Sequence, residues 1–190
     1  MTTWIKIVAL SVALMPVAGQ SAWACGTSTE ELALTLPGDW NVSNGFGTLT
    51  IGQRTIPLPA GNVDVAQIIP TADGIAVTGG GTPGTYALTF VEDARFVLDA
   101  PSQAVLDEGE AWFDDKPNIF TEDEVAVLAG CADGQLPPQL QATGQYQDPE
   151  GTVEFALYLF VVSETLMYGV VSGQLKAMNG TAKRVARWSR

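Results

Sequence analysis

The side chains that could do chemistry in this 190-residue chain are mostly carboxylates, with 21 Asp and Glu and no histidine. The lack of histidine excludes Ser-His-Asp and Cys-His catalysis, histidine-based metal sites and the commonest general base. Glycosidases need only a pair of carboxylates, but no motif in the sequence singles out such a pair. We therefore predict a non-enzymatic protein with no catalytic residue and no cofactor, and keep a carboxylate-only enzyme as a third hypothesis.

Acidic side chains are concentrated in residues 107–124, "DEGEAWFDDKPNIFTEDE", which hold eight of them. Ca²⁺ takes roughly six to eight oxygen ligands, so this segment has enough carboxylates to bind one ion. It lacks the D-x-D-x-D-G spacing of an EF-hand loop. We expect a solvated acidic loop and no metal site, with calcium binding by 107–124 as the alternative.

The first 24 residues have the features of an export signal. One lysine precedes an apolar run over 7–19, and Ala22 and Ala24 form the A-x-A pattern that a signal peptidase accepts. A helix that spans a bilayer needs about 20 residues, so this run is too short to cross. We predict a signal peptide over 1–24, no transmembrane span, and a periplasmic or secreted bacterial protein.

Two cysteines, Cys25 and Cys131, remain after this cleavage. An even number of cysteines in an exported chain favours a disulfide because the compartment is oxidising. Cleavage before Cys25 would also permit a lipoprotein anchor, but Trp23 stands where the lipoprotein signal has small residues. We therefore predict a Cys25–Cys131 disulfide, with acylation of Cys25 as the less favoured alternative.

Length and charge limit the class of protein. Residues 25–190 are enough for one well-buried core but not comfortably for two, and no repeat or linker divides them, so we expect a single domain. The net charge of −12 at pH 7 argues against nucleic acid and against an anionic membrane surface, because both are bound through Lys and Arg.

Short β-branched and aromatic runs bounded by turn residues recur along the chain, whereas a helical stripe of apolar residues is nearly absent after the signal. Asp73-Gly74 and Asn179-Gly180 are typical hairpin turns. We predict strands at 38–43, 46–57, 62–69, 74–78, 85–91, 95–99, 124–129, 139–146, 152–162, 165–175 and 181–188. The pattern predicts an all-β antiparallel up-and-down barrel, with a two-sheet β-sandwich as the alternative.

The sequence "LPGDWNVSNGFGTLTIG" (36–52) contains Gly38-Asp39-Trp40 at the start of the first expected strand. A G-x-W in this place resembles the calycins, the group that includes the lipocalins and avidins. The resemblance implies a barrel in which Trp40 plugs one end, with an arginine of the last strand over its indole as in lipocalins. Arg184 and Arg187 are the candidates. The middle lipocalin motif Thr-Asp-Tyr is missing, and no biotin-site residue is implied.

The segment "TVEFALYLFVV" (152–162) is apolar on both faces, with Phe155 on one and Tyr158 on the other. A strand with water on one side should alternate between apolar and polar residues. Something must therefore cover its second face. We expect another part of the same chain first, and a homo-oligomer interface through 152–175 second.

Taken together, these patterns predict an exported binding protein that holds a small, largely apolar ligand in a lipocalin-like barrel. We expect Trp40 to form the floor and Phe155, Tyr158 and Tyr168 to line the cavity, although a one-residue slip in strand register would invert such a list. The alternative is a protein-binding module of the cell envelope, such as a barrel-type inhibitor or a complex subunit. A cavity distinguishes the two, because an inhibitor has a packed core and an exposed partner surface.

Overall fold

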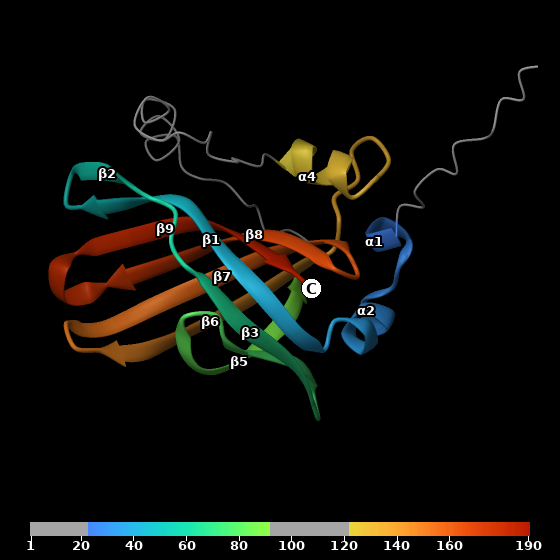
Figure 1. The fold of residues 1–190 in the computed structure, drawn as a ribbon, viewed down its shortest axis with the longest axis horizontal. Helices are drawn as coiled ribbons and strands as arrows, with labels where there is room; N and C mark the ends of the chain where they lie inside the picture. The colour runs from blue at the N-terminus through green and yellow to red at the C-terminus, as the bar shows by residue number, and fades with distance from the viewer. Residues whose placement is uncertain (1–22, 92–121) are drawn as a thin grey trace, which may run out of the picture.

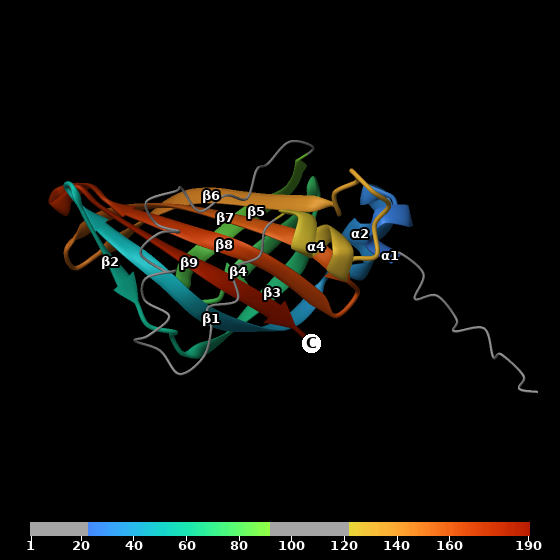
Figure 2. The same ribbon diagram turned by 90° about the horizontal axis from the view of Figure 1, so that it is seen from above.

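The computed structural model describes residues 23–91 and 122–190, which form a closed antiparallel barrel (Figure 1). The strands of these residues make one sheet in the order β2-β1-β3-β4-β5-β6-β7-β8-β9, and β1 also pairs with β9. This last pairing closes an eight-stranded ring, while β2 pairs with the second half of β1 as an extension. Figure 2 shows β6, β7, β8 and β9 running side by side across the molecule.

The strands are β1 Gly38–Ile51, β2 Arg54–Leu58, β3 Val63–Thr71, β4 Gly74–Gly79, β5 Thr82–Val91, β6 Gln139–Asp148, β7 Gly151–Ser163, β8 Leu166–Leu175 and β9 Gly180–Ser189. The helices are α1 Trp23–Gly26, α2 Thr29–Thr35, α4 Glu122–Leu128 and the 3₁₀ turn η2 Lys176–Met178. The prediction of an all-β barrel is confirmed. The sandwich alternative is wrong, because β1 and β9 pair from Asn41 opposite Ser189 to Ile51 opposite Gly180 and join the two ends of the sheet.

Two helices were not predicted: α4 replaces an expected strand, and α2 lies where no element was expected. The strand expected at 124–129 falls mostly within α4, in which Val125 is buried; Ala129, four residues later and just after the end of α4, is buried too. Residues four apart lie on one face of a helix. The β-branched valines of this segment favour a strand by propensity, which led to the wrong prediction. Helix α2 starts after Ser28, whose Oγ accepts a hydrogen bond from the backbone N–H of Glu31. The S-x-x-E capping pattern could have identified α2. The strand expected at 95–99 lies outside the described residues.

Trp40 and α2 close one end of the barrel. The Trp40 side chain is fully buried, and its Nε1–H donates a hydrogen bond of 3.1 Å to the Leu36 carbonyl at the end of α2. The Arg190 guanidinium lies over the indole, with its carbon 4.2 Å from the ring centroid. It also donates hydrogen bonds to the carbonyls of Leu36, Thr35 and Pro37. Apolar packing therefore closes this end of the barrel, and Arg190 links Trp40 to the end of α2 and the residues after it.

The arginine expected over Trp40 is therefore Arg190, and the prediction of Arg184 or Arg187 for this role is wrong. Arg187 is exposed on the outer face of β9, between the inward-facing Ala186 and Trp188. Arg184 pairs with Gly47 near the opposite end of the barrel. Burial lowers the pKa of the Arg190 guanidinium, an effect that the charge of Glu164 partly offsets.

Helix α4 covers the outer face of β7 and β8 near the closed end. Phe160 and Val162 of β7 pack with Val125 of α4 in a cluster separate from the barrel interior. Cys25 and Cys131 pack against this cluster and form a disulfide with their Cα atoms 5.6 Å apart, which confirms the predicted pairing. The chain itself thus supplies the cover expected for this part of 152–175, and the bond occupies the thiol that acylation would need.

The predicted signal peptide lies outside the described residues except for its last two positions. Ala24 is fully buried in the main core, and Trp23 packs against that core. Cleavage after Ala24 would remove both side chains, and the cleavage site stays a prediction. No helix within 23–91 or 122–190 is long and apolar enough to cross a membrane.

Candidate ligand-binding pocket inside the barrel

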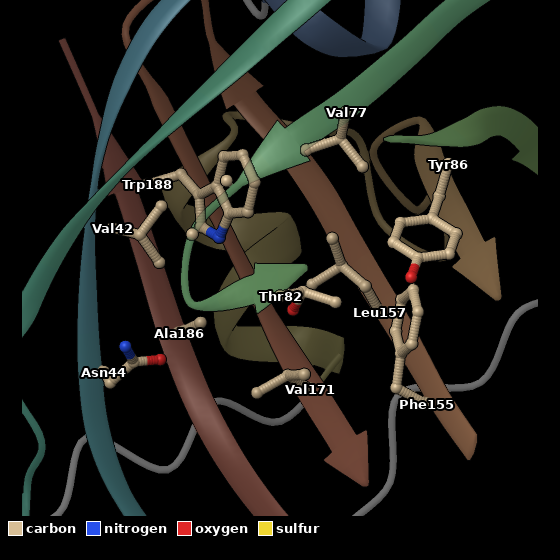
Figure 3. A pocket seen from close by; sticks show the side chains of 12 residues that line it. Val42, Asn44, Val77, Thr82, Tyr86, Phe155, Leu157, Val171, Ala186 and Trp188 are labelled. Carbon is tan, nitrogen blue, oxygen red and sulfur yellow. The ribbon is translucent and has the colours of Figure 1, made fainter. Parts of the chain in front are cut away.

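A pocket lies inside the barrel, between the plugged end and the opposite mouth (Figure 3). The volume that the centres of water molecules can occupy in it is about 30 Å³. One water needs roughly 10–15 Å³ on this measure, so the pocket has room for about two. The residues that line it are Val42, Asn44, Val77, Gly79, Gly80, Thr82, Tyr86, Phe155, Leu157, Val171, Ala186 and Trp188.

Strand alternation places this lining on the inner face of the barrel. On β7, the buried positions Phe155 and Leu157 are two residues apart, as the period of a strand requires. Leu157 stands opposite Val171 of β8, so the two side chains face the same space. On β9, Ala186 and Trp188 continue the same face. The single methyl of Ala186 leaves room that a larger side chain would fill.

Trp188 brings a polar group into this apolar space. Its side chain is 3% exposed, yet its indole Nε1–H has no hydrogen-bond partner among the described residues. Figure 3 shows the nitrogen edge of the ring turned into the pocket. A buried donor without an acceptor costs on the order of 1–3 kcal/mol. A ligand that brings an acceptor to this N–H would remove that free-energy cost.

One wall of the pocket is a pair of aromatic rings. Tyr86 and Phe155 pack edge to face, with ring centroids 4.5 Å apart. They can do so because residue 144 of β6 is a glycine: a Cβ there would lie 2.4 Å from the Tyr86 ring and 2.8 Å from Phe155. The Tyr86 hydroxyl donates a hydrogen bond to the Pro83 carbonyl, which ties the ring to the start of β5.

Polar groups surround the mouth of the pocket. Asn44 of the lining donates a 3.0 Å hydrogen bond from its side-chain amide to Asp64. Arg184 donates to the carbonyls of Gly45 and Pro59, and burial lowers the pKa of its guanidinium. Each of these groups has a hydrogen-bond partner at the rim. The residues that line the pocket include no charged side chain.

A second tyrosine stands beyond the aromatic wall. Tyr146 lies 6.3 Å from Phe155 between ring centroids. Burial raises the pKa of Tyr146, and the charges of Asp148 and Tyr86 raise it further. Its hydroxyl therefore stays protonated at neutral pH.

The residues predicted to line the cavity divide between the two faces of the barrel. Phe155 lines the pocket as expected. Trp40 is in the main core at the plugged end and does not line the pocket. Tyr168 packs in the outer cluster beside α4, and the hydroxyl of Tyr158 accepts a hydrogen bond from Gln141. Neither tyrosine belongs to the lining.

This correction has a simple cause. Residues 155 and 158 differ by an odd number, so on one straight strand their side chains point to opposite faces. Tyr168 pairs with Phe160 across β7 and β8 and shares its outward direction. Sequence reasoning missed the other eleven lining residues, among them Trp188, which lies on the last strand two residues after the lining residue Ala186.

Metal binding finds no support in the described part of the chain, which contains no group of three or more His, Cys, Asp or Glu that could hold an ion. The acidic segment considered for calcium, 107–124, lies almost entirely outside the described residues. Calcium binding there stays untested.

Comparison with known proteins adds little to this geometry. No family model matches the chain, and no curated protein is similar to it. Among solved structures, it is similar to a protein of unknown function from the DUF3598 family of Nostoc punctiforme, with 10% sequence identity and a TM-score of 0.33. The match covers 83% of this chain and 48% of that chain, so this chain spans about half the length of its neighbour. A likeness of this degree carries no argument about function.

Proposed function

We propose that this chain is a non-enzymatic binding protein whose barrel holds a small, largely apolar ligand. The observation that supports this most is an uncharged pocket inside the barrel that the side chains of residues 23–91 and 122–190 leave unfilled. Protein interiors pack like organic crystals and leave few voids larger than one water. A pocket of this kind, closed at one end and opening toward a polar rim, has the form of a ligand site.

The chemistry of the lining supports binding over catalysis. Valine, leucine and aromatic side chains provide most of the surface, and the lining includes no carboxylate, thiol or histidine. The hydroxyls of Thr82 and Tyr86 therefore have no carboxylate or imidazole in the lining to activate them as nucleophiles. The lining favours a ligand whose buried part is apolar.

The size of the pocket limits the ligand. About 30 Å³ is room for two waters, whereas drug-sized ligands occupy pockets of roughly 300–1,000 Å³. We expect the ligand to be slender, or to displace the Tyr86 and Phe155 rings, which are the two largest lining side chains toward the mouth. Movement of these rings enlarges the site without disturbing the plug at Trp40.

The plugged end also supports a calycin-like barrel. The first strand begins with Gly38-Asp39-Trp40, and an arginine next to the last strand lies over the buried indole. This is the arrangement that the resemblance to lipocalins implied, with Arg190 in the role. The disulfide is compatible with a periplasmic or secreted location, which we include in the proposal.

The direct test is a titration with methylcyclopentane, a six-carbon apolar probe, followed by the amide and indole resonances of the ¹⁵N-labelled chain. We expect shifts confined to lining residues and saturable binding. Ala186→Val should weaken binding by about tenfold, because its added methyl groups occupy the pocket. The matched control is Ala182→Val, because Ala182 lies on the same strand, four residues before Ala186, and does not line the pocket. This substitution should change the affinity by less than about twofold.

The proposal fails if the probe does not bind to the folded wild-type chain, or if both valine variants lose binding equally. Thermal unfolding of each variant shows whether the barrel is intact. An empty pocket in a folded barrel would favour the alternative, a protein-binding module that uses its outer surface.

A further inference from the structure

The Trp188 indole specifies the ligand more closely than the apolar lining does. Its N–H is buried, points into the pocket and meets no acceptor in the described chain. By contrast, the other core tryptophan at the plugged end donates to the Leu36 carbonyl. Buried tryptophan N–H groups usually find a partner. The exception at 188 lines the pocket, where a ligand could supply the acceptor.

The lining also determines what kind of acceptor can enter. The lining has no Lys or Arg. A charged acceptor such as a carboxylate would therefore lose its hydration in the pocket without gaining a cation as partner, which is costly. Two arginines at the ends of the barrel have other partners: Arg190 donates to carbonyls at the plugged end, and Arg184 donates to carbonyls at the rim. A neutral acceptor avoids that cost.

We infer that the ligand is a neutral apolar molecule with a hydrogen-bond acceptor, such as a ketone, ester or ether, inserted so that its oxygen accepts from Trp188 Nε1–H. The inference rests on the proposed function, since it concerns the same pocket. It makes Trp188 the residue that orients the ligand. The apolar remainder then extends past Val171 and Phe155 toward the mouth.

A matched pair of ligands tests the hydrogen bond. Cyclopentanone and methylcyclopentane have the same ring and the same number of heavy atoms, and only the ketone has an acceptor. Affinities from water are not comparable directly, because the ketone is better hydrated. The informative quantity is how each affinity changes when Trp188→Phe removes the N–H but keeps an aromatic ring.

We expect Trp188→Phe to weaken cyclopentanone binding by about fivefold relative to its effect on methylcyclopentane, the range of one hydrogen bond. In the wild type, the indole proton of Trp188 should shift downfield with the ketone and not with the hydrocarbon. Thermal unfolding checks that the variant is folded.

The outcomes separate the two proposals. If neither ligand binds to the wild type, the pocket is not a ligand site and both proposals fall. If both bind and Trp188→Phe changes the two affinities equally, the proposed function stands and the inference is overturned, because a retained water then satisfies the N–H. A ketone that binds without shifting the indole proton also overturns it.

Discussion

At the scale of single residues, the contact that closes the barrel is the one between Arg190 and Trp40. The guanidinium stacks on the indole and donates to three carbonyls where the chain passes from α2 into β1. It therefore joins the region after the last strand to the entry of the first. If this side chain is shortened, the ring face loses its cation and the three carbonyls lose these hydrogen bonds, although the Leu36 carbonyl still accepts from Trp40 Nε1–H.

We predict that Arg190→Ala lowers the free energy of unfolding by about 1–3 kcal/mol, from the lost cation–π contact and hydrogen bonds. Urea unfolding followed by tryptophan fluorescence measures the change. Arg187, an exposed arginine on β9, provides the control: Arg187→Ala should lower the free energy of unfolding by less than about 0.5 kcal/mol. Equal effects of the two substitutions would mean that the contact over Trp40 contributes nothing specific.

The sequence predicted the tryptophan and the type of its partner but not the partner's number. Arg184, Arg187 and Arg190 are spaced three apart, so on a strand they cannot all face inward. Sequence patterns do not give the end of β9, and Arg190 reaches the indole only because it follows the last paired residue, Ser189. The same alternation of side chains along a strand explains why Tyr158 and Tyr168 do not line the pocket.

At the scale of elements, the pairing of β7 with β8 depends on a glycine on the inner face. At Gly169, a Cβ would lie 1.9 Å from the Tyr158 carbonyl oxygen and 2.7 Å from Leu159. Four residues along the same strand and face, a Cβ at Gly173 would meet Val153 at 3.6 Å, an ordinary contact. The two positions look alike in sequence and differ only in how close the neighbouring strand lies.

Gly169→Ala should therefore destabilise the barrel by more than about 1 kcal/mol, because the added methyl forces the two backbones apart. Gly173→Ala should be neutral or slightly stabilising, since alanine reduces the entropy of the unfolded chain without a clash. The midpoints of thermal unfolding compare the two. A Gly173→Ala variant less stable than Gly169→Ala would show that the strand spacing described here is wrong.

The helices show where reasoning about elements was incomplete. Most strands were predictable because turn residues bound short β-branched runs. The two short helices, α2 and α4, were missed because each has fewer than three turns and gives no long apolar stripe, although the S-x-x-E pattern at Ser28 indicates the start of α2. Their stability comes from tertiary contacts, among them the disulfide that links α1 to the residues after α4.

At the scale of the whole molecule, the sequence predicted a closed barrel and an apolar interior, but not how much of that interior is filled. Packing volume depends on which side chains meet, and Gly144 shows this: its missing side chain is replaced by the Tyr86 and Phe155 rings. The pocket that remains is small because the aromatic rings occupy the space beside this glycine. Its position next to Trp188 was visible only once the strands were in register.

The measurement that tests the central claim most directly is a crystal structure of the protein under xenon pressure. Xenon enters apolar cavities and is a single atom, so it suits a pocket of about 30 Å³. We expect one xenon in contact with Val77, Leu157 and the Trp188 ring, and none there in the Ala186→Val variant. Xenon absent from this pocket in the wild type, with ordered waters or side chains filling the space, would contradict the account.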